Sequence, residues 1–129
     1  MRIKLVAIPV DDQQKALDFY TDVLGFKKSQ DIPVGEYRWI QVASPEEDSA
    51  ELSLEPNVNP ASKAFQESLM EQGIPITAFE VDDVDAEHKR LTDSGVVFTT
   101  DPMDAGEVRI AVFADTCGNL IQIYTPPPS

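Results

Sequence analysis

An internal repeat constrains this sequence more than any other feature. The segment at 7–12 (AIPVDD) returns 71 residues later at 78–83 (AFEVDD), and GEYR at 35–38 returns at the same offset as GEVR. Gly25 and Gly95 match at an offset of 70, so one residue of slippage separates the two halves. Several matches in one register indicate a duplication, and the fold must therefore consist of two similar modules.

Each half shows the same order of predicted elements. Apolar, β-branched segments at 3–10 and 76–82 predict strands, and the aspartates that follow each of them predict helix N-caps. Helices are expected at about 13–24 and 84–94, each closed by a glycine. Three more strands follow in each half, at about 26–31, 36–43 and 50–55, and at about 96–100, 107–114 and 119–125. The sequence therefore predicts an α+β fold of two tandem βαβββ modules.

The halves are joined by a segment that is itself predicted to be helical. Asn59-Pro60 opens a helix over about 60–72 that ends at Gly73. Module one then covers about 1–58 and module two about 74–127. No Gly/Ser-rich linker separates them, and neither four-stranded sheet could bury both of its faces alone, so we expect one domain over 1–129.

The charge and the cysteine content limit the partners and the compartment. The formal net charge is −13, which disfavours nucleic-acid binding and attracts cationic ligands, although an acidic surface also serves solubility alone. The single cysteine allows no internal disulfide and fits a reducing compartment. The sequence contains no apolar run that could span a bilayer and no signal-peptide pattern, so a cytoplasmic protein without a membrane partner is expected.

Two motifs add a family resemblance to the repeat. The sequence FYTDVLGF at 19–26 closes the first helix, and DTCGNLIQI at 115–123 forms a turn before the last strand. In combination with tandem βαβββ modules, they resemble the vicinal oxygen chelate superfamily of glyoxalase I, extradiol dioxygenases, fosfomycin-resistance enzymes and bleomycin-resistance proteins. The resemblance implies that the two modules form an eight-stranded cupped sheet and that the protein is a homodimer.

The resemblance also implies four positions where metal enzymes of that superfamily carry ligands. These are Leu5, Glu51, Ile76 and Gln122, which form two pairs at the repeat offset of 71. Leucine and isoleucine have no lone pair to donate, and glutamine offers only a neutral amide oxygen. A catalytic divalent metal usually needs about three protein ligands. We therefore predict no metal, no cofactor and no catalytic residue.

Other side chains are candidates for binding a ligand within the cup. Arg38 and Arg109 lie two residues after Glu36 and Glu107, so each arginine is predicted either to clamp an anionic ligand or to form an ion pair. An arginine is also the expected partner of Glu51. Including the stacking surface of Trp39 and the residues that alternate with Glu51 and Gln122, the candidates are Leu5, Arg38, Trp39, Glu51, Ser53, Ile76, Arg109, Gln122 and Tyr124.

Two reactive side chains are interpreted as structural. His88 is the only histidine and aligns through the repeat with Leu17, on the helix stripe that faces the sheet. Cys117 lies in the turn before the last strand and has no histidine near it in sequence. We expect a partly buried helix histidine and an unreactive turn cysteine.

Three functional hypotheses remain. The preferred one is a metal-free protein, similar to the bleomycin-resistance branch, that binds a small and cationic molecule. The second is an enzyme of the superfamily, glyoxalase- or lyase-like, that uses either a metal with other ligands or Glu51 as a base. The third is an interaction module whose cup is filled by its own side chains, as the large apolar Leu5 and Ile76 allow.

Overall fold

The computed structural model describes residues 1–46 and 49–126. The chain divides into two compact units, Met1–Gln66 and Glu67–Ser129. The boundary falls inside helix α2 (Pro60–Gln72), the connecting helix that the sequence predicted over 60–72. Each unit carries its own four-stranded mixed sheet, so the predicted α+β fold of two modules is confirmed.

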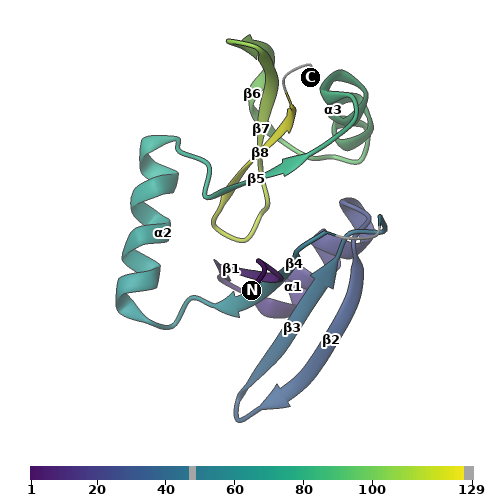
Figure 1. The fold of residues 1–129 in the computed structure, drawn as a ribbon. Coiled ribbons are helices and arrows are strands. Elements are labelled where there is room, and N and C mark those ends of the chain that lie inside the picture. The colour runs from purple at the N-terminus through teal and green to yellow at the C-terminus, as the bar shows by residue number, and fades with distance from the viewer. Residues whose placement is uncertain (47–48, 127–129) are drawn as a thin grey trace. The chain divides into compact units, whose positions relative to one another are not determined.

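Unit 1 begins with strand β1 and ends in the first turns of α2 (Figure 1). Its sheet has the order β1-β4-β3-β2, with β1 parallel to β4 and the other neighbours antiparallel. The elements are β1 (Leu5–Val10), α1 (Gln13–Asp18), the π-helical turn η1 (Phe19–Val23), β2 (Lys27–Val34), β3 (Tyr37–Ala43) and β4 (Glu51–Pro56).

Unit 2 repeats this topology with the order β5-β8-β7-β6, and β5 is parallel to β8. Its elements are β5 (Thr77–Glu80), α3 (Val84–Asp93), β6 (Phe98–Ala105), β7 (Val108–Ala114) and β8 (Leu120–Thr125). No helix among the residues described in either unit is long and apolar enough to cross a lipid bilayer.

The helices that follow β1 and β5 begin and end at the predicted residues. The carboxylates of Asp12 and Asp83 accept hydrogen bonds from the backbone N–H groups three residues later, as N-caps do. Gly25 and Gly95 follow the helices with φ angles of 92° and 91°, a left-handed conformation that glycine adopts without strain. The first helix has one residue more between cap and glycine, and the π-turn η1 accommodates it.

Each sheet buries the face that carries its helix. In unit 1, alternate residues of β3 and β4 are buried together with the apolar face of α1, and the fully buried Tyr20 packs edge-on against Phe19. In unit 2, alternate residues of β7 and β8 are buried beside Val84 and Leu91 of α3. The residues of these strands that are buried on the helix side are Ile40, Val42, Leu52 and Leu54 in unit 1, and Ala111, Phe113, Ile121 and Ile123 in unit 2.

A tight turn organised by Asp115 leads into β8. The buried Asp115 carboxylate accepts hydrogen bonds from the backbone N–H groups of Cys117 (2.8 Å) and Asn119 (3.0 Å), and from the Asn119 side-chain amide (2.9 Å). Thr116 has a φ of 66°, which is rare for a β-branched residue, and Gly118 has a φ of 100°. The carboxylate therefore holds a backbone conformation that the turn would not favour by itself.

Candidate functional site

In unit 1, α1 packs against one side of the sheet, and the opposite side carries a different set of side chains. Residues 38, 40 and 42 of β3 point toward α1, so residues 37, 39 and 41 point to the opposite side. The strand registers place the matching residues of β1, β2 and β4 on that same side. We call this side the open face of unit 1, and it includes Leu5, Ala7, Ile32, Val34, Tyr37, Trp39, Gln41, Glu51, Ser53 and Glu55.

The β2–β3 hairpin presents an apolar surface on the open face. Ile32 lies opposite Trp39, and Val34 lies opposite Tyr37. The four residues are exposed by 50%, 49%, 56% and 37% respectively. A contiguous group of large apolar side chains on a monomer surface marks a binding site more often than isolated ones do. Two of the four are aromatic and therefore offer flat surfaces for stacking.

Polar side chains adjoin this apolar surface. The Trp39 indole N–H donates to Oε1 of Gln41 at 2.5 Å, and Gln41 lies opposite Ser53 on β4. At the beginning of β4, the Ser29 hydroxyl donates to the Glu51 carboxylate. The expectation of an arginine partner for Glu51 was therefore wrong. The open face combines stacking surface with hydrogen-bonding groups and the carboxylates of Glu51 and Glu55.

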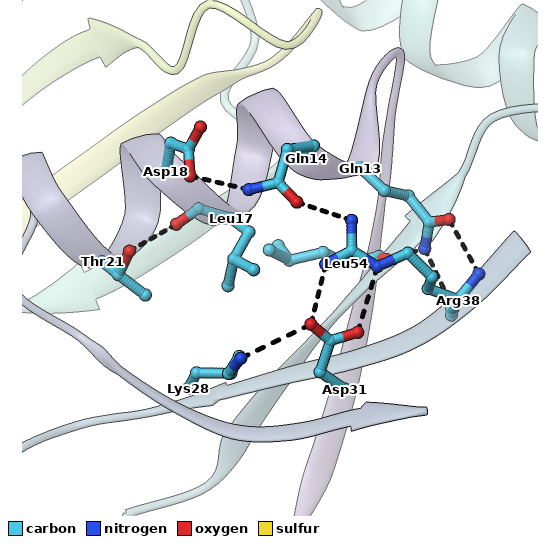
Figure 2. A network of polar contacts seen from close by, with 9 residues as sticks. All are labelled: Gln13, Gln14, Leu17, Asp18, Thr21, Lys28, Asp31, Arg38 and Leu54. Carbon is cyan, nitrogen blue, oxygen red and sulfur yellow. Dashed lines mark hydrogen bonds and ion pairs between the residues drawn. The ribbon is translucent and has the colours of Figure 1, made fainter. Parts of the chain in front are cut away.

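Arg38 does not belong to the open face. Figure 2 shows its guanidinium beneath α1, where it pairs with Asp31 (2.7 and 3.0 Å) and donates to Gln14 (2.7 Å). The i, i+2 spacing had suggested Glu36 as the ionic partner, but Glu36 lies in the turn between β2 and β3. Arg38 thus ties the hairpin to the helix, and the ion-pair interpretation holds with a different carboxylate.

Arg109 has the same role in unit 2. Its guanidinium donates to Asp85 of α3 at 2.7 and 3.0 Å and to Asp104 of β6 at 3.0 Å, whereas Glu107 lies in the β6–β7 turn. The predicted alternative of a ligand clamp fails for both arginines because they lie on the sides of their sheets that carry the helices. Each of the two repeated arginines therefore connects the helix of its unit to the sheet of the same unit.

These ion pairs predict a pH-dependent stability. Hydrogen bonding to Arg38 holds the pKa of Asp31 below its ordinary value of 3.8, and Arg109 does the same for the pKa of Asp85. A lowered carboxyl pKa stabilises the fold above pH 3.8, and that contribution is lost as the pH falls through the lowered value. Urea midpoints of wild type and Asp31→Asn should therefore differ equally at pH 7 and pH 5, and should converge toward pH 3. A difference that persists unchanged at pH 3 contradicts this assignment.

The strand registers correct the predicted equivalence of Glu51 and Gln122. Leu5 lies directly opposite Glu51, whereas Gln122 lies opposite Ala78 and Val112. In unit 1 the corresponding place, opposite Ala7 and Gln41, belongs to Ser53. The connection before β8 is two residues shorter than the connection before β4, so the constant offset of 71 fails there. Gln122 is thus the counterpart of Ser53 rather than of Glu51.

The matching face of unit 2 is more buried along β7 and β8. Tyr124 lies opposite Ile110, and both are half-buried, while Val112 is buried opposite the half-buried Gln122. The half-buried Ile76 precedes β5, and its backbone N–H donates to the carbonyl oxygen of Leu120. This face provides fewer exposed aromatic and polar groups than the open face of unit 1.

The metal-ligating residue types are dispersed. Within residues 1–46 and 49–126, no group of three or more His, Cys, Asp and Glu side chains is placed to share a metal ion. The Nε2 atom of His88 lies 3.3 Å from Asp101, and its ring packs edge-on against Phe98. Cys117 is fully buried in the Asp115 turn. Both residues have the surroundings expected of structural side chains.

The comparison with known families agrees with this architecture. The model of the Glyoxalase/Bleomycin resistance protein/Dioxygenase superfamily matches residues 2–123. The chain belongs to this superfamily. The match runs from the first unit into β8, the last strand of the second unit, so the duplicated fold is the superfamily fold.

Relatives within the superfamily cover the chain almost completely. YurT, an uncharacterized protein of Bacillus subtilis (strain 168), is 52% identical over 124 residues, which are 95% of this chain and 98% of YurT. The crystal structure of UcmS2 is 30% identical, covers 98% of each chain and has a TM-score of 0.84. TnmS3, an antibiotic-binding protein from Streptomyces sp. CB03234, is 32% identical over 98% of this chain and 96% of its own, with a TM-score of 0.79.

Sequence reasoning missed several residues of the open face, among them Ile32, Val34 and Gln41. The signal was present in the hairpin, where apolar residues alternate on both sides of Gly35-Glu36. A two-residue turn at that point puts Val34 opposite Tyr37 and Ile32 opposite Trp39. Gln41 follows Trp39 by two residues and so had to share its face.

Proposed function

We propose that this protein binds a small, partly planar molecule on the open face of unit 1 without the help of a metal ion. The observation that carries the proposal is the exposed apolar surface of Ile32, Val34, Tyr37 and Trp39 on a rigid sheet. Flat aromatic side chains recognise planar ligands at a low cost in conformational entropy, because each has only two side-chain torsions to fix.

The donor set supports binding without a metal. Leu5 occupies the position opposite Glu51, and the positions around Gln122 are Ala78 and Val112. None of these aliphatic side chains can coordinate a cation. A lone carboxylate such as Glu51 falls short of the roughly three protein ligands that a catalytic metal needs. The residues on these strands do not fit a superfamily metal centre.

The negative charge of the protein and its similarity to TnmS3 indicate the kind of ligand. Glu51 is the half-buried carboxylate of the open face, and the net charge of −13 raises the local concentration of cations. A cationic planar molecule satisfies both the aromatic surface and the carboxylate. TnmS3, which shares the fold at 32% identity, is an antibiotic-binding protein, and this supports an antibiotic-like small molecule as the ligand here.

Binding can be followed through Trp39, the only tryptophan in the chain. Titration with the cationic planar dye proflavine or the neutral planar dye acridone is expected to quench its fluorescence and to raise the melting temperature. Trp39→Ala, measured by thermal shift, should weaken binding about tenfold, because one stacking contact is worth roughly 1 kcal/mol or somewhat more. Phe65→Ala removes an aromatic residue that is exposed on α2, outside the open face, and should leave the affinity unchanged.

Two outcomes of these titrations would contradict binding at the open face. Equal losses in Trp39→Ala and Phe65→Ala, or no binding of either dye by wild type, contradict the proposal. Glu51→Gln serves as the charge control, because it should remove any preference for proflavine over acridone while leaving acridone binding intact. An unchanged preference for proflavine in Glu51→Gln contradicts the role of this carboxylate.

A further inference from the structure

We propose that Gln41 is the positioning residue that holds the Trp39 ring as a fixed platform for the ligand. This inference rests on the proposed function and deepens it. The Trp39 indole N–H donates to Oε1 of Gln41 at 2.5 Å, and both side chains lie on the open face. A ring held at its N–H cannot turn about its outer torsion without breaking that hydrogen bond.

The position of Trp39 makes such a restraint necessary. The side chain is 49% exposed, so packing alone leaves half of its surface free to move. Its neighbour across the hairpin, Ile32, is itself 50% exposed and restrains only one side of the ring. An exposed tryptophan without a further contact samples several rotamers, and a ligand that stacks on it must then immobilise the ring.

Gln41 is suited to this role because its own backbone is fixed. It lies in the centre of the sheet, paired with Gln30 on β2 and with Ser53 on β4. Trp39 is on the same strand two residues earlier, so its distance from Gln41 is set by the strand rise alone. The acceptor therefore holds the ring from the centre of the sheet rather than from the hairpin turn.

Three glutamine variants test this role, and the fluorescence of Trp39 is measured in each of them. Gln41→Leu removes the acceptor while keeping a similar volume, and Gln41→Glu keeps an acceptor. Gln72→Leu makes the same change at an exposed residue of α2, outside the open face, whose amide donates to the Ser68 hydroxyl. Time-resolved fluorescence anisotropy of the free proteins reports the motion of Trp39 alone, because the chain has no other tryptophan.

The expected result is specific to the acceptor. The fast, sub-nanosecond loss of anisotropy should be small in wild type, Gln41→Glu and Gln72→Leu, and should grow in Gln41→Leu. The dissociation constant for acridone should rise roughly threefold to tenfold in Gln41→Leu and should stay within about twofold in the other two variants. Acridone is neutral, so the added charge of Gln41→Glu does not dominate its binding.

The outcomes separate this inference from the proposed function. If wild type binds acridone and Gln41→Leu changes neither the anisotropy nor the affinity, the positioning role is overturned. If wild type binds neither acridone nor proflavine, the proposed function fails, and the anisotropy alone decides whether Gln41 holds the ring. Should Gln41→Leu fail to fold, the indole ¹⁵N–¹H heteronuclear NOE of wild type decides. A value below that of the β3 backbone overturns the role.

Discussion

Replacing Gln13 by leucine is expected to lower the free energy of unfolding by about 2–3 kcal/mol. The Gln13 amide bridges two strands, because its Nε2 donates to the carbonyl oxygens of Arg38 (2.6 Å) and Leu54 (2.9 Å). Its Oε1 also accepts the backbone N–H of Arg38 at 3.1 Å (Figure 2). One side chain thus satisfies three backbone groups of partly buried strands, and each group left without a partner costs about 1 kcal/mol.

Unit 2 shows why unit 1 needs this glutamine. Strands β7 and β8 pair continuously from Arg109–Thr125 to Ala114–Leu120, and Val84 occupies the position equivalent to Gln13. The described register of β3 with β4 contains Gln41–Ser53 and Val42–Leu52 and does not extend to Arg38. Beyond that point the Gln13 amide takes the place of the missing backbone partners.

Urea unfolding followed by circular dichroism measures the effect, and Gln14→Leu is the matched control. Gln14 is the next residue of α1, and its exposed side chain bonds to the side chains of Arg38 and Asp18 rather than to backbone groups of the strands. Its loss should cost about 0.5 kcal/mol. Similar losses in both variants contradict the bridging role, as does slow hydrogen exchange of the Arg38 amide in Gln13→Leu. Because Trp39 follows Arg38, the bridge also supports the strand that carries the proposed stacking platform.

The element order was predictable because local signals and the repeat agree. The aspartate caps, the closing glycines and Asn59-Pro60 each act within a few residues, and each was confirmed. Even the one-residue slippage between the halves was visible, although its physical form, the π-turn η1, was not. A repeat reports that a residue has been inserted but not how the backbone absorbs it.

The site was less predictable because it depends on register and on faces. The constant repeat offset of 71 paired Glu51 with Gln122. Because the turn before β8 is two residues shorter, Gln122 is instead equivalent to a residue two positions after Glu51, which lies on the same face of β4. Arg38 and Trp39 are adjacent, so they necessarily point to opposite sides of β3, yet both were candidates for one cup. Which of the two side chains lies on the open face depends on the side of the sheet against which α1 packs.

Removing the carboxylate of Asp115 is expected to have the largest effect, a loss of about 4 kcal/mol in the free energy of unfolding for Asp115→Ala. The side chain is fully buried and accepts hydrogen bonds from two backbone N–H groups and from the Asn119 amide. Alanine leaves these donors without that acceptor inside the protein. It also leaves the positive φ of Thr116 without the hydrogen bonds that hold it.

Two further variants make the expectation specific. Asp93→Ala removes a carboxylate whose ion pair with Lys89 is largely exposed, and it should change the stability by about 0.5 kcal/mol or less. Asp115→Asn keeps an oxygen for the two backbone donors but turns an N–H₂ group toward the Asn119 amide, so a loss of about 2 kcal/mol is expected. The order Asp93→Ala, Asp115→Asn, Asp115→Ala should therefore appear in the urea midpoints.

The location of the damage is a further test, because the turn leads directly into β8. Asp115 and Asn119 also pair through their backbones, with the Asp115 N–H donating to the Asn119 carbonyl oxygen at 3.0 Å. If the carboxylate holds the turn closed, Asp115→Ala should speed hydrogen exchange first at Cys117 and Asn119, before the amides of β3 in unit 1. Simultaneous exchange of both units with no change at the turn would show that Asp115 contributes only to global packing. Because β8 carries Gln122 and Tyr124, the same experiment shows how firmly this turn fixes their strand.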